Sequence, residues 1–337
     1  MKKPIFFAIL AAFLLSGCGS VVSDNNIQEQ EVHKADLSSK EDLEPRVSQN
    51  QEPEVTSPSR RIVCWGDSLT EGTGGEGVTF PKVIEELTGI ETINYGVYGE
   101  CSSLIAARQG GNGQHVENIS EIPADTEPVP IKIKGDKDGA SELWLTFGDA
   151  GVNPCMIAGV MGELSIDPED STKYFTRLEA GEAVAINNDN DTFYTHGMLD
   201  AREDDILIIW SGSSDGLVEG MTVDIPIDNI RSMLEYSGCE EYVILDYEAV
   251  CLDGRFDEWN DALRDAFGEH VLDIREYLLE HGLEDAGIEP TEGDLEDIAL
   301  GHMPRSIMSD EYHGTGDFYR IIGEQIVEKM RELGYIE

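Results

Sequence analysis

Basic residues are scarce in this sequence. Its 337 residues include 23 lysines and arginines against 68 aspartates and glutamates, which gives a formal net charge of -45 at pH 7. Proteins bind nucleic acids largely by neutralising phosphates with lysine and arginine side chains. Because a surface this acidic repels a polyanion, the composition excludes nucleic acid as a partner.

Long hydrophobic runs are also lacking. The apolar run Ile5–Leu15 is shorter than the roughly 20 residues that a membrane-spanning helix needs. A short apolar run that follows two lysines is typical of a secretory signal. The junction Leu15-Ser16-Gly17-Cys18 resembles the bacterial lipoprotein box, in which Cys18 becomes the lipidated first residue. We therefore expect residues 1–18 to be a lipoprotein signal peptide with its cysteine. The protein would be extracytoplasmic and anchored to a bacterial membrane through lipid on Cys18, with ordinary secretion as the alternative.

Residues 19–60 have hardly an aromatic residue and are rich in Ser, Asn, Gln, Glu and Pro. Such a segment cannot bury enough apolar surface to offset the chain entropy lost on folding. We expect it to be a disordered tether between the membrane and a folded body.

Cysteine usage gives no disulfide framework. Beyond Cys18 the sequence has an odd number of cysteines, so at least one is unpaired unless it bridges another chain. No CxxC motif or His/Cys spacing indicates zinc, and the Asp-rich segment 187–191 lacks the Gly and Glu of a calcium-binding EF-hand loop and is interpreted as a turn. The cysteines in question are Cys64, Cys101, Cys155, Cys239 and Cys251.

Five short apolar runs alternate with helical patterns from residue 61 onward. Continuous apolar strands that alternate with helices predict a parallel sheet covered on both faces. The runs are 62–65, 92–95, 206–210, 242–245 and 271–274, and the helical patterns include Phe80–Leu87 and Phe318–Leu333.

Residues 106–203 interrupt this rhythm and are predicted to be a β-rich insertion, a small sandwich or barrel. The remaining segments, 61–105 and 204–337, would form the α/β body. The insertion follows a loop that borders the expected cleft, so we expect it to cover or flank the substrate site. The alternative is that it lies on the surface and plays no part in the site. Its short stretches are Val129–Ile133, Leu143–Phe147, Ile157–Ile166, Tyr174–Leu178 and Ala183–Ile186. Its aromatic residues Trp144, Tyr174, Phe175, Phe193 and Tyr194 could stack on sugars, although their spacing favours a core.

Two short motifs carry candidate chemistry. Ser68 follows a strand and precedes a helix, so it is expected at the carboxyl edge of the sheet, where α/β sheets bind ligands. As a single feature it could equally be a helix cap. Near the C-terminus, Asp310 and His313 are three residues apart, which lets the carboxylate hold one imidazole nitrogen while the other faces a serine.

These motifs resemble the GDSL/SGNH hydrolase family. The resemblance covers Gly66-Asp67-Ser68-Leu69, the loop from Asn94 to Glu100, the segment Trp210–Asp215 and the final Asp310–His313. It implies a flavodoxin-like three-layer α/β/α fold and hydrolysis of esters without a metal or cofactor. By motif, Ser68 would be the nucleophile, His313 the general base and Asp310 its orienting partner. The N–H groups of Ser68 and Gly99 would line the oxyanion hole.

One position departs from the family. The third block normally reads Gly-x-Asn-Asp and supplies an Asn side chain to the oxyanion hole, but here Ser214 stands in its place. Its hydroxyl can still donate, and losing such a donor lowers the rate by about 10² to 10³. We expect an extracytoplasmic serine esterase acting on O-acyl, most plausibly acetyl, groups of a glycan. The alternatives are a lysophospholipase or lipase of the same mechanism, and a weakened hydrolase body that binds surface glycans.

Overall fold

The structure is a computed structural model that describes residues 60–136, 143, 145–217, 221–248 and 255–337. The predicted signal peptide, Cys18, nearly all of the predicted tether and Cys251 lie outside these residues. Of the four cysteines that are described, Cys64, Cys155 and Cys239 are buried and Cys101 is half-buried, and all four are free thiols.

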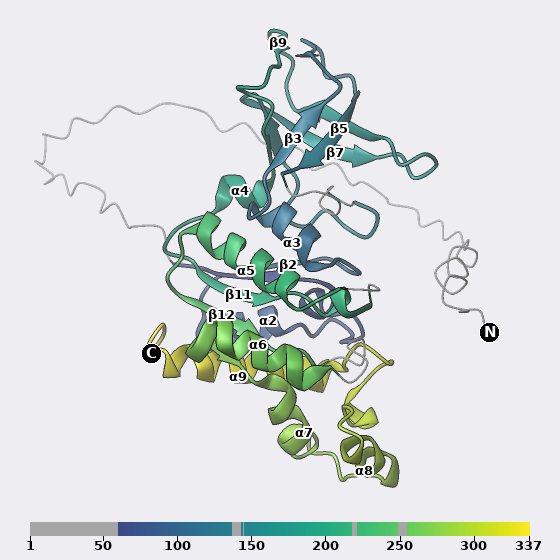
Figure 1. Ribbon diagram of the computed structural model, residues 1–337, viewed down its shortest axis with the longest axis vertical. Helices are drawn as coiled ribbons and strands as arrows, with labels where there is room; N and C mark the ends of the chain where they lie inside the picture. Colours follow the sequence, from purple (N-terminus) through teal and green to yellow (C-terminus); the bar gives the residue numbers. More distant parts are fainter. Residues whose placement is uncertain (1–59, 137–142, 144, 218–220, 249–254) are drawn as a thin grey trace, which may run out of the picture. The chain divides into compact units, whose positions relative to one another are not determined.

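Five parallel strands form the central sheet, in the order β13-β12-β11-β1-β2 (Figure 1). This is the flavodoxin-like order, in which the first and third strands of the sheet are neighbours. The crevice at the carboxyl ends of two such strands is the usual ligand site of open α/β sheets. The strands, all within the predicted apolar runs or one residue beyond them, are β1 Ile62–Gly66, β2 Thr92–Gly96, β11 Ile206–Trp210, β12 Tyr242–Leu245 and β13 Val271–Leu272.

Helices cover both faces of this sheet. Along β1, Ile62 and Cys64 belong to one hydrophobic core, and Val63 and Trp65 belong to another, because successive side chains of a strand point to opposite faces. The first core includes α2 (Phe80–Thr88), α7 (Ile274–Asp285) and α9 (Gly316–Glu332), and the second includes α3 (Ser102–Gln109), α5 (Asp224–Ser237) and α6 (Phe256–Phe267). The predicted three-layer α/β/α fold is therefore confirmed. The other helices are α1 Ser68–Glu71, α4 His196–Asp200, α8 Glu292–Ala299 and the 3-10 turns η1 Ser214–Leu217, η3 Gly268–His270 and η4 Arg305–Ile307.

The inserted strands form a second, antiparallel sheet beyond α3 and α4 (Figure 1). Its six strands have the order β10-β6-β7-β8-β5-β3. Its two edges meet at a bridge between His115 and Thr192, where the Val116 N–H also donates to the Asp191 carbonyl at 2.8 Å, so the sheet is nearly a closed barrel. The strands are β3 Gln114–Glu117, β5 Val129–Gly135, β6 Cys155–Ile157, β7 Val160–Ile166, β8 Lys173–Arg177 and β10 Phe193–Tyr194, while β4 Glu121–Ile122 pairs with β9 Val184–Ala185.

Two predictions for the insertion need correction. The stretch Ile157–Ile166 is the end of β6 and all of β7, joined by a turn in which Ala158 and Gly159 have φ values of 49° and 79°. The strand predicted for Leu143–Phe147 is wrong, because residues 143 and 145–147, which the structure describes, form an irregular loop. The Asp-rich segment 187–191 is a turn, as interpreted, in which Asn190 and Asn187 exchange hydrogen bonds.

The helix α3 joins the body to the insertion. The predicted boundary between residues 105 and 106 falls inside it. Ile105 and Ala106 pack in a core of the body, whereas Ala107 packs in the core of the insertion. Because one rigid helix contributes to both cores, the insertion continues directly from a structural element of the body.

The seam of the near-barrel is a site of pH-dependent stability. The Nδ1 atom of His115 lies 2.9 Å from Asp191 Oδ1, and its Nε2 atom lies 3.1 Å from Asp136 Oδ1. The hydrogen bond with Asp191 raises the pKa of His115 above 6.5, assisted by Asp136 and opposed by partial burial. A raised folded-state pKa means that the stabilisation is complete below pH 6.5 and is lost as the pH rises through the folded value.

We expect His115→Gln to melt below the wild type at pH 5.5, and the gap to shrink at pH 9. Thermal unfolding followed by circular dichroism measures both. His302 is an exposed histidine of the body, so His302→Gln is the matched control. A gap of the same size at both pH values would contradict the assignment.

Candidate active site

Ser68 lies at the turn between β1 and α1. The Asp67 carboxylate caps the helix by accepting the Leu69 N–H at 3.0 Å. Only glycine fits at position 66, because a Cβ there would lie 2.0 Å from the Thr70 Oγ1 atom. Ser68 is the first residue of the helix, so its N–H is one of those that no carbonyl of the helix can accept. The turn therefore presents both the hydroxyl and the N–H of Ser68 at the carboxyl edge of the sheet.

His313 and Asp310 lie on the loop between η4 and α9. Asp310 Oδ1 accepts the N–H groups of Tyr312 and His313 at 2.7 and 2.8 Å, which folds the loop around the carboxylate. The His313 Nδ1 atom lies 2.8 Å from Asp310 Oδ2, and its Nε2 atom lies 3.0 Å from Ser68 Oγ. The structure thus brings the three predicted residues into one chain of hydrogen bonds, although Ser68 and Asp310 are more than 240 residues apart.

The ionisation of Asp310 suits this arrangement. Partial burial opposes the charged form, but the hydrogen bonds from the His313 ring and from the two N–H groups outweigh it and lower the pKa of Asp310 below its ordinary value. The carboxylate therefore stays charged at neutral pH and can hold the Nδ1–H of His313.

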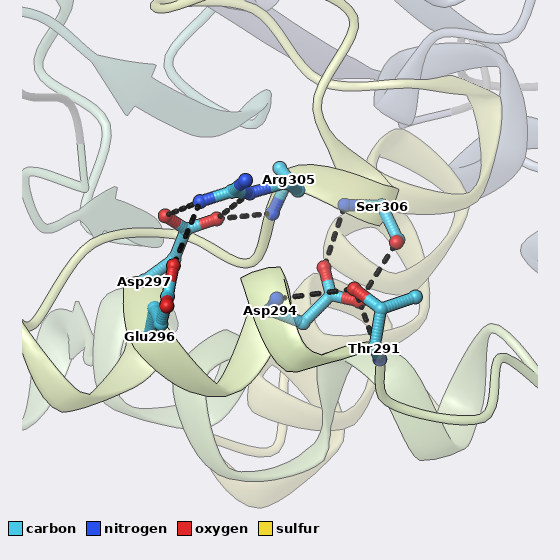
Figure 2. A network of polar contacts seen from close by, with 6 residues as sticks. All are labelled: Thr291, Asp294, Glu296, Asp297, Arg305 and Ser306. Atoms are coloured by element: carbon cyan, nitrogen blue, oxygen red, sulfur yellow. Dashed lines mark hydrogen bonds and ion pairs between the residues drawn. The ribbon is translucent and has the colours of Figure 1, made fainter.

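A polar network around the buried Asp294 supports the segment before this loop (Figure 2). Asp294 on α8 accepts hydrogen bonds from the N–H and hydroxyl of Ser306 at 2.9 and 2.8 Å, and also from Thr291. Burial opposes ionisation, but these bonds lower the pKa of Asp294 to about 2. Arg305 forms a two-pronged ion pair with Asp297. Together these contacts fix η4 against α8, and η4 leads directly into the loop that carries Asp310 and His313.

Asp215 connects two other loops of the site. Its carboxylate accepts the Ser102 N–H at 2.6 Å and the Ser102 hydroxyl at 2.7 Å, at the start of α3. Burial raises the pKa of Asp215 to about 6 even though both bonds favour the charged form. The loop just before Ser102 contains Gly99, whose φ of 73° lies in the left-handed region that glycine adopts readily. Asp215 therefore ties the loop after β11 to the loop that carries Gly99.

Ser214 has a different partner from the one expected. Its hydroxyl donates to Asp67 Oδ2 at 3.2 Å. A hydroxyl has a single proton, so in this arrangement Ser214 cannot donate to an oxyanion at the same time. Burial raises the pKa of Asp67 to about 6, while the bonds from Leu69 and Ser214 lower it. A third oxyanion donor at Ser214 stays a prediction that requires the hydroxyl to rotate away from Asp67.

A buried ion pair lies beneath these loops and was not predicted. The Arg108 Nε atom donates to Glu100 Oε2 at 2.7 Å, and both side chains are almost fully buried. The guanidinium also donates to the carbonyl oxygens of Gly66 at the end of β1, Tyr95 in β2 and Ala150 in the insertion. The sequence offers no local signal for this, because the partners come from three separate segments.

Two exposed aromatic residues next to His313, and a third next to one of them, were also missed. The Tyr98 ring lies 5.7 Å from the His313 ring and 5.4 Å from the Phe147 ring, and the Tyr312 ring lies 6.4 Å from the His313 ring. Of the insertion aromatics proposed from the sequence, Phe175 and Phe193 are buried core residues, Tyr174 and Tyr194 are half-buried, and Trp144 lies outside the described residues.

Within the described residues, no group of three or more His, Cys, Asp or Glu side chains is arranged to hold a metal ion. Also within the described part, no helix is both long and apolar enough to cross a membrane.

Comparison with known proteins gave matches among solved structures alone. No family model and no curated protein matches the sequence. A lipolytic G-D-S-L family protein from Desulfitobacterium hafniense DCB-2 is similar at 14% identity and a TM-score of 0.41, over 80% of this chain and 98% of that chain. One from Veillonella parvula DSM 2008 has 13% identity and a TM-score of 0.40, over 80% and 97%. A peptidoglycan O-acetylesterase has 11% identity and a TM-score of 0.39, over 82% and 91%.

Replacing Arg108 should destabilise the protein strongly. Arg108→Met leaves the Glu100 carboxylate buried without its cation, and breaking such a pair costs about 3–5 kcal/mol of the free energy of unfolding. Urea unfolding of the purified variant measures the loss. Adding Glu100→Gln to this variant removes the unpaired buried charge and should restore part of the lost free energy of unfolding.

Arg231→Met is the matched control, because Arg231 pairs with Asp228 at the exposed surface of α5. We expect it to cost less than about 1 kcal/mol. An Arg108→Met variant as stable as this control would refute a central role for the buried pair.

Substitutions of Ser214 distinguish its two possible partners. An asparagine amide has two N–H donors and can serve Asp67 and an oxyanion together. If a donor is missing, Ser214→Asn should raise kcat on ethyl acetate by about 10²- to 10³-fold, the range known for one oxyanion donor. Ser214→Ala should change kcat by less than 10-fold, since the hydroxyl faces Asp67. A loss of 10² or more with alanine would instead show that Ser214 already donates to the oxyanion.

Proposed function

We propose that this protein is a serine esterase in which Ser68, His313 and Asp310 act as a catalytic triad. The observation that carries the proposal is the continuous set of hydrogen bonds from Ser68 Oγ through His313 to Asp310. His313 is buried at 6% exposure, which limits competition from water for its Nε2 atom. A glycan-binding body without activity would have no need of this alignment.

The residues supply the steps of acyl transfer in order. Ser68 Oγ attacks the ester carbonyl carbon while His313 Nε2 takes its proton, and the Asp310 carboxylate stabilises the resulting imidazolium. The N–H groups of Ser68 and Gly99 are the proposed donors to the oxyanion. His313 then protonates the departing alkoxide, which leaves the acyl group on Ser68. A water molecule, deprotonated by His313, attacks this acyl-enzyme, and His313 returns the proton to Ser68 Oγ as the carboxylic acid leaves.

We further propose that the substrate is an O-acylated carbohydrate, carrying acetyl groups, outside the cytoplasm. The support is the lipoprotein-like sequence around Cys18 and the polar sequence between it and the body, which together would hold the enzyme at a membrane surface facing polysaccharide. Release of acetate from acetylated oligosaccharides, compared with release of fatty acid from lysophospholipids, tests this choice of substrate.

Ser68→Ala should abolish ester hydrolysis and labelling by a fluorophosphonate probe, because both need the nucleophilic oxygen. Asp310→Asn should lower kcat by about 10⁴, since the amide favours the wrong imidazole tautomer. Gel fluorescence measures the labelling, and a pH-stat measures the turnover.

Ser232→Ala on α5 is the control and should label like the wild type. Full labelling of Ser68→Ala would show that another residue is the nucleophile, and the proposed mechanism would then fail.

A further inference from the structure

Three exposed aromatic residues, which we call the aromatic rim, are connected to His313 by ring contacts, two of them directly and the third through Tyr98. Tyr98, Phe147 and Tyr312 are 42%, 46% and 37% exposed. Tyr98 makes ring contacts with both Phe147 and His313, and Tyr312 makes one with His313. Single exposed aromatic residues are common, but contiguous apolar groups next to a reactive residue indicate a binding surface.

The insertion contributes the outer part of this rim. Phe147 belongs to the loop before β6, and a Cβ placed on Gly99 would lie 3.6 Å from its ring. The next residue, Gly148, packs against Val97 of the same body loop. Phe147 is absent from the insertion's own hydrophobic core, so its position over the Gly99 loop is not explained by packing within the insertion.

The chemistry of the site determines which part of an ester reaches this rim. In acyl transfer the same imidazole nitrogen that accepts the serine proton must later protonate the leaving oxygen. The leaving oxygen therefore has to come within hydrogen-bond distance of His313 Nε2. The alcohol portion of the ester thus lies on the His313 side, next to Tyr98 and its neighbour Phe147, whereas the acyl portion starts at the carbon that Ser68 attacks.

We infer that Tyr98 and Phe147 form a stacking platform for a neutral sugar ring that carries the ester, so that the insertion sets the specificity for the alcohol. The inference rests on the proposed esterase function. Aromatic faces pack well against the C–H faces of a sugar, and the tyrosine hydroxyl adds a polar group. The rim is composed of two tyrosines and a phenylalanine, and a net charge of -45 repels anionic alcohols such as phosphate esters.

The test compares a sugar ester with an ester that lacks the ring. Phe147→Ala and Tyr98→Ala are assayed with a 6-O-acetyl methyl glucoside and with ethyl acetate in a pH-stat. We expect the ratio of the two kcat/KM values to fall about tenfold in each variant, which corresponds to about 1.4 kcal/mol of lost contact. Tyr98→Phe keeps the ring and should retain most of the ratio. Leu178→Ala, an exposed apolar residue of the insertion outside the rim, should leave the ratio at the wild-type value.

Two results would overturn the inference. Equal losses on both esters would mean that Phe147 acts by positioning the Gly99 loop. A loss that grows when the acetyl group is replaced by octanoyl on the same sugar would mean that the rim binds the acyl chain.

Binding measurements separate this inference from the proposed function. In the Ser68→Ala background, calorimetric titration with an acetylated xylo-oligosaccharide should show weaker binding when Phe147→Ala is added. Unchanged binding refutes the platform whether or not the wild type hydrolyses esters, whereas a wild type inert on both esters counts against the proposed function alone.

Discussion

The geometry of the candidate site at the carboxyl edge of the sheet depends on the contacts of the buried Arg108 guanidinium. It donates to the carbonyl oxygens of Gly66 and Tyr95, at the carboxyl ends of β1 and β2, and it pairs with Glu100 one residue after Gly99. A planar group with five N–H donors can satisfy several acceptors at fixed angles, which a lysine cannot do. Burial raises the pKa of Glu100, and the pairing with Arg108 opposes this effect. The same side chain therefore sets the separation of the two loops from which the proposed oxyanion donors come.

Arg108 also connects the insertion to the body. Its guanidinium donates to the Ala150 carbonyl, and its own carbonyl accepts the Thr195 hydroxyl at 2.6 Å, so it contacts both the loop that enters β6 and the residue that caps α4. Ala150 is three residues from Phe147. The same group that contacts the strand ends therefore also restrains the loop that carries Phe147. The insertion, which continues from α3, is thereby also tied to the body at Ala150 and Thr195.

The sequence predicted the elements whose signals are local. Each central strand is a short apolar run, so the strands and the parallel sheet could be predicted, and the short motifs around Ser68 and the Asp310–His313 pair indicated the candidate site residues. The Leu143–Phe147 stretch has the apolar content of a strand, but Leu143 and Leu145 pack in the core of the insertion, and Phe147 faces the Gly99 loop of the body. Local apolar content does not show that these contacts are made from an irregular loop. Arg108 is missed for the same reason, because an arginine on a helix normally predicts an exposed surface, whereas here four separate acceptors compensate its burial.

In the proposed acyl transfer, buried carboxylates near the site would stabilise the positive charge on His313 and destabilise the negative charge on the oxyanion. The pKa values of Asp67 and Asp215 are raised to about 6, so both are largely ionised at pH 8. In the proposed mechanism, the negative charge of Asp67 near His313 would favour the imidazolium that forms when Ser68 loses its proton, but it would oppose the oxyanion that forms at the same moment. Backbone N–H groups are then better oxyanion donors than flexible side chains, because they cannot turn toward a neighbouring carboxylate. The hydroxyl of Ser214 has turned in this way toward Asp67. In the proposed mechanism, the remaining oxyanion donors are the N–H groups of Ser68 and Gly99, whose loops Arg108 and Asp215 hold in place.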